Sequence, residues 1–370
     1  MRIGICARTW GENGGIGVYT RSVIASMLDL DARNEYHILY SNKVHLGSLK
    51  GTDRVREVYL PANGKWMWDQ WAVPRYAHRE RLDVIFHTKF AIPFLAKCRT
   101  AMVLHGTERF VHPEFHQSAD LWFFKTVYPQ YLKRASLIIA VSNRAKEDII
   151  SYLGIDPEKV RVAYLATDPI FRPISDPEQL ELVREKYNLP PRFILFAGHI
   201  YPGKNFGRLL EAFSTVRKDM NIHLVVAGGM RWKYQNDLNA LETLGLQENV
   251  HFAGYVPQNE LVGFYNLAAA TVFPSHYESF GLPNIEANAC GCPLVTSRTG
   301  GMPEAAGNAA VYVDPLDVAD IANAIVRVLT DEDLRQTLIA KGYENAARFS
   351  WEKTARATLD ALEWAVAPAK

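Results

Sequence analysis

Two glutamates flank a short segment of backbone that is suited to binding an anion. Glu278 and Glu286 have seven residues between them. Each carboxylate can accept hydrogen bonds from the hydroxyl groups of a sugar. The amides between them can hold a phosphate if a helix begins there, because unpaired N–H groups and the helix dipole both favour negative charge. The segment therefore predicts a site for a sugar joined to a phosphate; the alternative is a pair of solvated surface glutamates.

The elements around these glutamates favour that geometry. An apolar run at 269–273 ends at Pro274, which predicts a buried strand that runs into a loop. Pro283 lacks an amide hydrogen and has a fixed φ, so it suits the first turn of a helix that reaches about Ala289. Gly281 allows a bulky anion to approach the backbone closely. The amides expected at this helix N-terminus belong to Ser279, Phe280, Gly281 and Leu282.

The composition is that of a soluble globular protein of about two domains. The chain has 370 residues, of which 48% are hydrophobic and 22% charged, and its formal net charge is +1. This balance gives no general preference for nucleic acid. No apolar run is long enough for a transmembrane helix, and no secretory leader is expected, so we expect a cytoplasmic protein. The four cysteines form no C-x-x-C pair and are expected to be buried free thiols; they are Cys6, Cys98, Cys290 and Cys292.

Strands and helices alternate through the first half of the chain, which predicts a mostly parallel sheet. A strand at 3–7 precedes a glycine-rich turn and a helical pattern at 18–30, the opening of a doubly wound α/β unit. Gly14 and Gly15 in the turn let a ligand approach the backbone, although a plain tight turn also explains them. Further strands are expected at 36–40, 55–60, 83–87, 101–105, 136–142 and 159–163, and helices at 71–79, 119–134 and 143–153.

A second α/β unit follows a segment rich in proline and acid. A strand at 193–198 leads into a loop that contains Lys204, and apolar residues at helical spacing follow from Phe206. Lys204 could point at a phosphate as a mobile charge, or be a solvated surface lysine. Later strands are expected at 223–228, 250–254, 270–273, 293–296 and 310–313, and helices at 177–187, 318–330, 334–349 and 351–365. The domains are thus expected at 1–170 and 192–350, with a linker at 171–191 and a last helix, 351–367, returning to the first domain.

The segment from Pro274 to Glu286 resembles the E-x7-E signature of retaining glycosyltransferases of family 4, and the resemblance extends over the whole chain. It implies the GT-B fold, in which two doubly wound Rossmann-like domains face each other across a cleft. It also implies a nucleotide sugar held mainly by the second domain, retention of anomeric configuration, and no metal ion. Hinge closure is expected around 165–192 and 345–352.

The resemblance assigns roles to further residues. The backbone of Gly14 and Gly15 would face the donor phosphates, and His105, at a strand end, would reach the donor sugar. The family often has His-Asp at this point, whereas this chain has His105-Gly106, with Glu108 as a substitute for the aspartate. A lone histidine in this position is more commonly structural.

In the second domain the resemblance assigns Lys204 to the diphosphate. The family has an arginine directly after the strand glycine, whereas this chain has His199 after Gly198. Arg231 or Lys233 could supply the missing cation. The nucleobase is expected beside Tyr255 and Val256, where backbone groups usually read the base.

An aromatic segment at 65–71 contains three tryptophans. It could contact the acceptor or a lipid headgroup region, or pack as the entry to a helix. Arg75, Arg79 and Arg81 add positive charge nearby, which could meet an anionic membrane or form an ordinary solvated helix face.

The function expected from the resemblance is transfer of a hexose from a nucleotide diphosphate sugar to a glycan. The chain is most similar to mannosyltransferases, so GDP-mannose is the expected co-substrate. A lipid-linked oligosaccharide of a surface polysaccharide is the expected acceptor, with peripheral contact at the inner face of the membrane. A nucleotide-sugar 2-epimerase, a sugar phosphorylase and a catalytically silent binding protein are the alternatives, because one fold hosts many functions.

Overall fold

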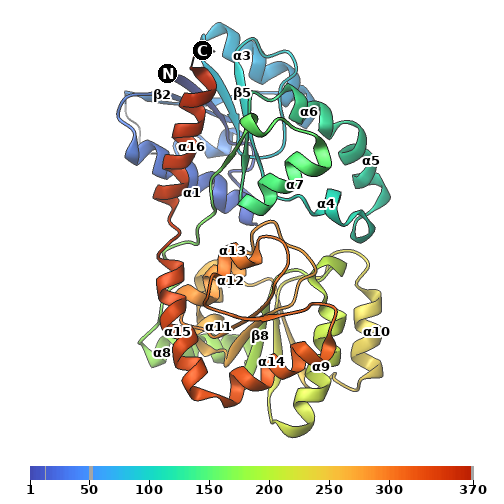
Figure 1. The fold of residues 1–370 in the computed structure, drawn as a ribbon. Coiled ribbons are helices and arrows are strands. Elements are labelled where there is room, and N and C mark those ends of the chain that lie inside the picture. The colour runs from blue at the N-terminus through green and yellow to red at the C-terminus, as the bar shows by residue number, and fades with distance from the viewer. Residues whose placement is uncertain (13, 50–52, 368–370) are drawn as a thin grey trace. The chain divides into compact units, whose positions relative to one another are not determined.

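The computed structural model describes residues 1–12, 14–49 and 53–367. The chain forms two compact units (Figure 1). The first unit comprises Met1–Val111, Ser118–Leu165 and Ser350–Lys370, and the second comprises His112–Gln117 and Ala166–Phe349. Each unit has its own parallel sheet with helices packed on it.

The first unit contains a seven-stranded sheet in the order β3-β2-β1-β4-β5-β6-β7, and all its strand pairs are parallel. Its strands are β1 (Arg2–Cys6), β2 (Glu35–Tyr40), β3 (Val55–Tyr59), β4 (Val84–His87), β5 (Arg99–Leu104), β6 (Leu137–Ala140) and β7 (Val160–Val162). Central strands such as β4 and β6 are buried along their whole length, which is why they read as continuous apolar runs in the sequence. The chain order reverses beside β1, so the strand reading predicted the doubly wound arrangement correctly.

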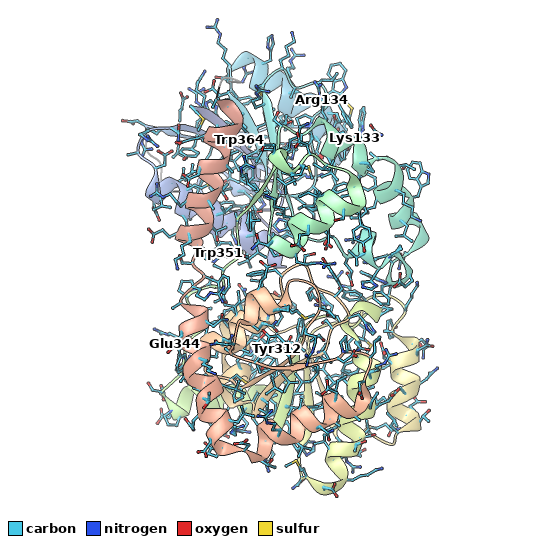
Figure 2. The ribbon with its side chains drawn as sticks, viewed as in Figure 1. Lys133, Arg134, Tyr312, Glu344, Trp351 and Trp364 are labelled. Carbon is cyan, nitrogen blue, oxygen red and sulfur yellow. The ribbon has the colours of Figure 1, made fainter. Side chains whose placement is uncertain are left out.

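Helices cover this sheet, and the last helix of the chain is one of them. They are α1 (Gly15–Leu30), α2 (Lys65–Met67), a π-helical turn η2 (Trp68–Ala72), α3 (Val73–Arg79), α4 (Glu108–Val111), α5 (Ser118–Thr126), α6 (Tyr128–Arg134), α7 (Asn143–Leu153) and α16 (Trp351–Val366), with short 3₁₀ turns η1 (Lys43–His45) and η4 (Pro157–Lys159). α16 packs beside α1, where the Trp351 and Tyr19 rings are 5.9 Å apart (Figures 1 and 2). The hydroxyl of Thr354 donates to the carbonyl of Tyr164, also within this unit.

Two helix expectations in the first unit need correction. The helix expected at 119–134 is divided at Val127 into α5 and α6, because Pro129 at the start of α6 cannot continue a preceding helix. The helix expected at 71–79 begins earlier, through α2 and η2. In that segment Trp68 is buried, whereas Trp66 and Trp71 are 62% and 54% exposed. The segment therefore both packs into the core and presents aromatic rings to solvent.

The second unit contains a six-stranded sheet in the order β10-β9-β8-β11-β12-β13, again with all its strand pairs parallel. Its strands are β8 (Phe193–Ala197), β9 (His223–Ala227), β10 (Val250–Gly254), β11 (Ala270–Phe273), β12 (Leu294–Ser297) and β13 (Val311–Val313). Its helices are α8 (Pro177–Tyr187), α9 (Phe206–Asp219), α10 (Gln235–Thr243), α11 (Gln258–Leu267), α12 (Leu282–Ala289), α13 (Met302–Ala306), α14 (Val318–Thr330) and α15 (Glu332–Ala346), with 3₁₀ turns η3 (Pro113–Phe115) and η5 (Pro202–Lys204).

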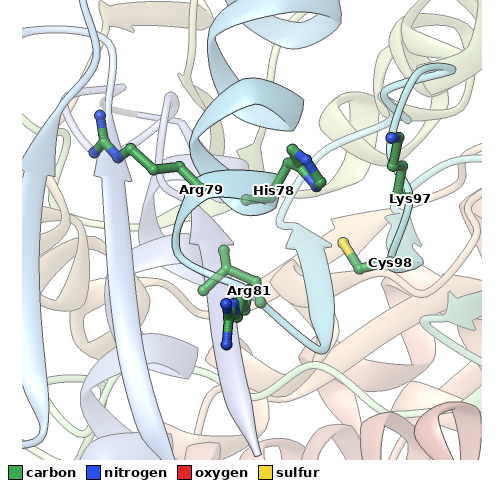
Figure 3. A pocket seen from close by; sticks show the side chains of 7 residues that line it. His78, Arg79, Arg81, Lys97 and Cys98 are labelled. Atoms are coloured by element: carbon green, nitrogen blue, oxygen red, sulfur yellow. The ribbon is translucent and has the colours of Figure 1, made fainter.

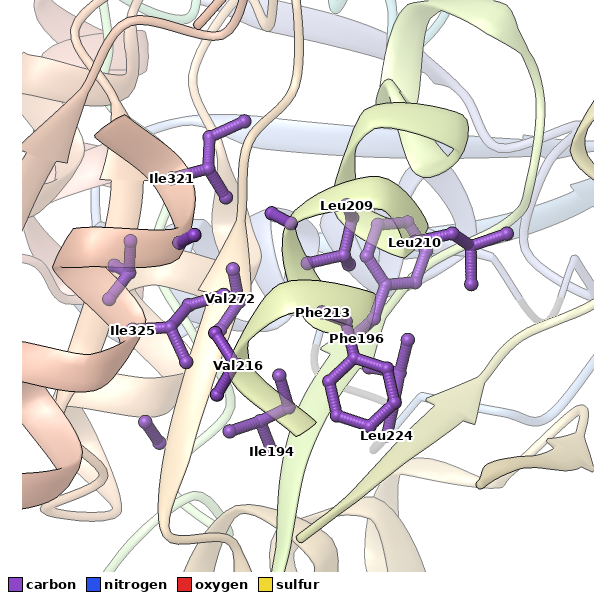
Figure 4. Close-up of a cluster of buried hydrophobic side chains, with 14 of the residues drawn as sticks. Ile194, Phe196, Leu209, Leu210, Phe213, Val216, Leu224, Val272, Ile321 and Ile325 are labelled. Carbon is purple, nitrogen blue, oxygen red and sulfur yellow. The ribbon is translucent and has the colours of Figure 1, made fainter. Parts of the chain in front are cut away.

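The core between α9, α14 and this sheet confirms the amphipathic pattern seen in the sequence. Figure 4 shows Leu209, Leu210, Phe213 and Val216 of α9 among the buried side chains of the sheet. Ile321 and Ile325 of α14 belong to the same cluster. Residues of β8 and β11 are part of this cluster, and the loops after these two strands carry Lys204 and Glu278.

A short segment from the first half of the chain belongs to the second unit. The Trp232 indole N–H donates to the carbonyl of Phe115 over 2.7 Å, and the Phe115 ring stacks on His276 with centroids 5.2 Å apart. Lys233 donates to the carbonyls of Glu114 and His116. The segment His112–Gln117 is thus fixed by side chains that lie more than 100 residues further along the chain.

Within the described residues, no helix is both long and apolar enough to cross a membrane. The cysteines are free thiols; Cys98 is half-buried and the other three are buried.

Candidate functional site

The predicted strand–loop–helix around the two glutamates is present. β11 is buried, and α12 begins at Leu282, one residue before the expected Pro283. Gly281 precedes the helix with φ of +98°, a conformation that side chains rarely adopt. The chain at 279–282 therefore turns sharply so that the N-terminus of α12 follows directly after the loop. Ser279 and Phe280 are buried within this turn.

A second glycine-rich loop supports the backbone of this turn. The amide of Gly301 donates to the carbonyl of Glu278 over 2.7 Å. A Cβ atom on Gly300 would lie 2.3 Å from the same carbonyl oxygen, and one on Gly301 would lie 2.3 Å from the carbonyl oxygen of Ser279. These glycines are therefore required for close backbone contact, which determines where Glu278 is placed.

Lys204 and Glu278 are in contact. Lys204 ends η5 after β8, Glu278 follows β11, and the ammonium group forms an ion pair with the carboxylate. Their side chains are 12% and 19% exposed, so the pair is shielded but reachable from solvent. The Lys204 ammonium also lies 4.6 Å from the centre of the Phe273 ring. The structure thus brings together two residues to which the sequence gave separate roles.

Glu286 lies inside α12 and is buried. The hydroxyl of Tyr265 donates to its carboxylate over 2.8 Å. Burial raises the pKa of Glu286 to about 7, and the hydrogen bond from Tyr265 opposes this effect. Glu286 can therefore change charge near neutral pH, and a polar ligand that donates hydrogen bonds would stabilise its ionised form.

His199 occupies the position where the family has arginine, and an arginine lies beside it. The guanidinium of Arg231 is 3.1 Å from His199 Nε2, and His199 Nδ1 is 3.2 Å from the carbonyl oxygen of Gly229. The backbone amide of Gly229 also lies 3.2 Å from Nδ1 and can donate to it when the ring proton is on Nε2. A proton on Nδ1 instead allows Nδ1 to donate to the carbonyl and Nε2 to accept from Arg231. Burial, and then the charge of Arg231, lower the pKa of His199, which favours a neutral ring. Of the two candidate cations, Arg231 is exposed beside this loop, whereas Lys233 donates to carbonyls of the segment His112–Gln117.

The remaining predicted residues of the second unit differ in exposure. Gly198 follows β8 with φ of +149°. A Cβ atom on Gly228, which follows the adjacent strand β9, would lie 1.9 Å from the carbonyl oxygen of Gly198. Tyr255, after β10, is 57% exposed, whereas Val256 is buried in the core. The side chain of Val256 is thus structural, which leaves its backbone for any contact with a base.

Three predicted residues lie in the first unit, at the carboxyl edge of its sheet. Gly14 caps α1, and α1 begins at Gly15. His105 follows β5, its Nε2 is 2.8 Å from the carbonyl oxygen of Thr88, and its ring packs against Tyr19. Burial lowers the pKa of His105 to about 4, so this histidine is neutral at physiological pH. In the neutral ring the proton is on Nε2, because Nε2 donates to the carbonyl oxygen of Thr88. Nδ1 is then an acceptor.

The sequence reading missed a pocket at the same edge of the first unit. Its volume is about 310 Å³, and its charged lining residues are Arg8, Glu12, Lys65 and Lys89. Arg8 and Lys89 each lie two residues after the end of a strand, β1 and β4 respectively. This position in the sequence could have predicted the pocket, because parallel sheets bind ligands at the carboxyl ends of their strands. Lys89 pairs with Glu12 at 3.1 Å, and Arg8 pairs with Asp69 at 3.3 Å. Burial raises the pKa of Asp69 to about 6.

Two doubly wound α/β units with these features define a GT-B glycosyltransferase. The model of the family described as "Glycosyl transferases group 1" matches residues 180–345. The model of the family described as "Glycosyltransferase Family 4" matches residues 13–170. The chain belongs to this family of glycosyltransferases.

Known proteins resemble the chain in sequence and in structure. O-antigen chain mannosyltransferase B of Escherichia coli is 31% identical over 78% of this chain and 76% of its own length. D-inositol 3-phosphate glycosyltransferase of Corynebacterium jeikeium is 33% identical over 62% of this chain and 57% of its own. HepE from Anabaena, solved with UDP-glucose, superposes with a TM-score of 0.75 at 19% identity, over 98% of this chain and all of that one. The last similarity supports the fold alone.

Proposed function

We propose that the protein is a retaining mannosyltransferase that transfers mannose from GDP-mannose to a glycan acceptor. The preference for mannose rests on the similarity to O-antigen chain mannosyltransferase B. We propose a lipid-linked oligosaccharide of a surface polysaccharide as the acceptor. The protein would then work in the cytoplasm, in peripheral contact with the inner face of the membrane.

The observation that carries the proposal is the contact of Lys204 with Glu278 beside the N-terminus of α12. This arrangement sets a cation and backbone amides next to a carboxylate. Lys204 and the amides of 280–282 would hold the diphosphate, Glu278 would accept hydrogen bonds from the hydroxyls of the transferred sugar, and Glu286 would hold the ribose. Arg231 would supply the second cation on the diphosphate, and the backbone at Tyr255 and Val256 would contact the base. From the first unit, the backbone at Gly14 and Gly15 and the ring of His105 would contact the donor.

In the proposed reaction, a hydroxyl oxygen of the acceptor bonds to C1 of the sugar as the bond from C1 to the diphosphate oxygen breaks. The hydroxyl proton passes to an oxygen of the departing phosphate on the same face. No enzyme nucleophile or metal ion takes part. Lys204 and the helix amides stabilise the charge that develops on the leaving diphosphate, which is electrostatic catalysis by prepositioned donors.

The pocket of the first unit lined by Arg8, Lys65 and Lys89 is the proposed place for the acceptor. It lies where parallel sheets generally bind ligands, at the carboxyl ends of the strands. Lys89 pairs with Glu12 and Arg8 pairs with Asp69, so the pocket offers both hydrogen-bond donors and acceptors to the hydroxyl groups of a glycan.

Thermal unfolding with UDP, GDP and ADP and their common sugar conjugates tests the proposal. A ligand at 100 times its Kd adds about 2.7 kcal/mol to the free energy of unfolding. We expect GDP and GDP-mannose to stabilise the wild type and to stabilise Glu286→Ala much less. Glu344→Ala, which removes an exposed glutamate of α15, is the control and keeps the full response. Stabilisation by another nucleotide series would overturn the choice of donor, and a folded protein that responds to none would overturn the nucleotide-sugar site itself.

A further inference from the structure

A second pocket of the first unit lies at the opposite edge of its sheet, near the amino ends of β4 and β5. Its volume is about 490 Å³. Figure 3 shows four basic side chains around it: His78, Arg79, Arg81 and Lys97. None of its described lining residues is acidic. Burial raises the pKa of the Cys98 thiol in its wall to about 11, so Cys98 adds no negative charge.

Two of the cations around this pocket form no ion pair with the carboxylates that the structure describes near it. Glu80 pairs with Arg79 at 2.9 Å and with Arg56 at 3.1 Å. Asp83 accepts a hydrogen bond from the backbone amide of Arg2, and its charge acts on Cys98 in the pocket wall. Among the residues that the structure describes, no carboxylate forms an ion pair with Arg81 or Lys97.

The backbone at Arg81 has a conformation in which arginine is less favourable than glycine. The amide of Leu82 donates to the carbonyl of Ala77 and that of Arg81 donates to the carbonyl of His78, which is the Schellman ending of α3. In this ending Arg81 takes the left-handed position, with φ of +51°, where glycine is the usual residue. The helix dipole would explain cations on the last turn of α3, but not Lys97, which comes from the segment before β5.

The surface next to Lys97 adds exposed apolar groups and more cations. Leu95 is 62% exposed, and Phe94 is 37% exposed and stacks on Tyr131. Lys133 and Arg134 lie in the last turn of α6 (Figure 2). The guanidinium of Arg134 donates to the carbonyl of Phe94.

We propose that this pocket binds a phosphate group through Arg81 and Lys97, with His78 and Arg79 beside them. Arginine can bind two phosphate oxygens at once, and lysine adds a point charge from the other wall. The group can belong to a phospholipid headgroup, which the exposed Leu95 would accompany, or to a soluble phosphate ester. The inference does not depend on the proposed transfer reaction, because the donor residues Lys204, Glu278 and Glu286 lie in the other unit.

The test uses the full chain, with glycerol phosphate and with vesicles of phosphatidylcholine alone or mixed with phosphatidylglycerol. The variant combines Arg81→Gly, which retains the left-handed backbone without strain, with Lys97→Gln. The control combines Arg217→Gln with Lys218→Gln; it removes the same charge from exposed positions at the end of α9. Stabilisation by GDP-mannose reports separately on the donor site and should be equal in all three proteins.

We expect the pocket variant to lose at least tenfold in affinity and the control to change less than twofold, with binding weakened by salt. Loss of glycerol phosphate binding with unchanged binding to anionic vesicles identifies a soluble ester as the ligand, and loss of binding to anionic vesicles alone identifies the headgroup. Loss of both shows that the pocket takes the phosphate group from either source. Equal losses in both variants, or a wild type that binds neither probe, would overturn the proposal.

Discussion

The ammonium group of Lys204 contacts the carboxylate of Glu278, although 74 positions separate the two residues in the chain. The reason is that β8 and β11 are neighbours in the second sheet, so the loops after them leave the same edge side by side. Each residue balances the other's charge in a partly buried place. A sugar diphosphate could replace both halves of this pair, with phosphate on the lysine and sugar hydroxyls on the glutamate.

Lys204→Gln should lower kcat/KM for sugar transfer by about 10²–10³, the usual effect of removing one donor to a developing charge. The fold should be retained, because glutamine can still donate to Glu278. Lys218→Gln, an exposed lysine at the end of α9, is the control. Steady-state kinetics with the donor identified by thermal unfolding gives the comparison. A Lys204→Gln enzyme as active as the control would exclude the proposed role.

Glu286 should make both stability and donor binding depend on pH. Its pKa in the folded protein, about 7, lies above its ordinary value of 4.5, so the folded state favours the protonated form. The contribution of this group to the free energy of unfolding is therefore fully present below pH 4.5 and is lost as the pH rises to about 7. Over that range the wild type should lose about 3 kcal/mol relative to Glu286→Gln, from 1.36 kcal/mol per pKa unit.

Donor affinity should change in the opposite direction. A ribose hydroxyl donates best to an ionised carboxylate, so the Kd of the donor should fall as the pH rises from 6 to 8, and Glu286→Gln should lack this dependence. Denaturant unfolding and calorimetry at several pH values measure the two effects. If the stability difference between the two proteins is the same at every pH, the carboxylate of Glu286 has an ordinary pKa.

Most of the fold could be predicted from the sequence, because the central strands of both sheets, such as β4, β6, β8 and β11, are short apolar runs. The sequence was also sufficient for the loop and helix that carry Glu278 and Glu286, since Pro274 and Pro283 restrict the backbone locally and Gly281 permits the left-handed turn between them. It could not predict the contact of Lys204 with Glu278, because strand order is a property of the whole sheet. Docking of the segment His112–Gln117 on Trp232 was missed for the same reason: nothing near Phe115 in the sequence indicates its partner.

Arg231→Gln should weaken binding of a nucleoside diphosphate about tenfold, which corresponds to about 1.4 kcal/mol, and leave binding of the nucleoside nearly unchanged. The reason is that Arg231 lies beside His199, where the family's arginine is absent. Lys233→Gln is the matched control: it should lower stability, because Lys233 holds the carbonyls of Glu114 and His116, without affecting phosphate binding. Isothermal titration with both ligands separates the effects. Equal losses for the nucleoside and its diphosphate would show that Arg231 does not contact phosphate.

Gly300→Ala should be more destabilising than Gly245→Ala, although the two glycines have nearly the same φ, +59° and +63°. A Cβ atom on Gly245 has no neighbour within 4 Å among the described residues, so that variant has only the backbone cost of about 1–2 kcal/mol. On Gly300 the Cβ atom would lie 2.3 Å from the carbonyl oxygen of Glu278, which should cost about 1–3 kcal/mol more. Because the clash displaces Glu278, Gly300→Ala should also lose donor binding, whereas Gly245→Ala should keep it. Equal stability of the two variants, measured by denaturant unfolding, would mean that the Gly300 loop yields without moving the glutamate.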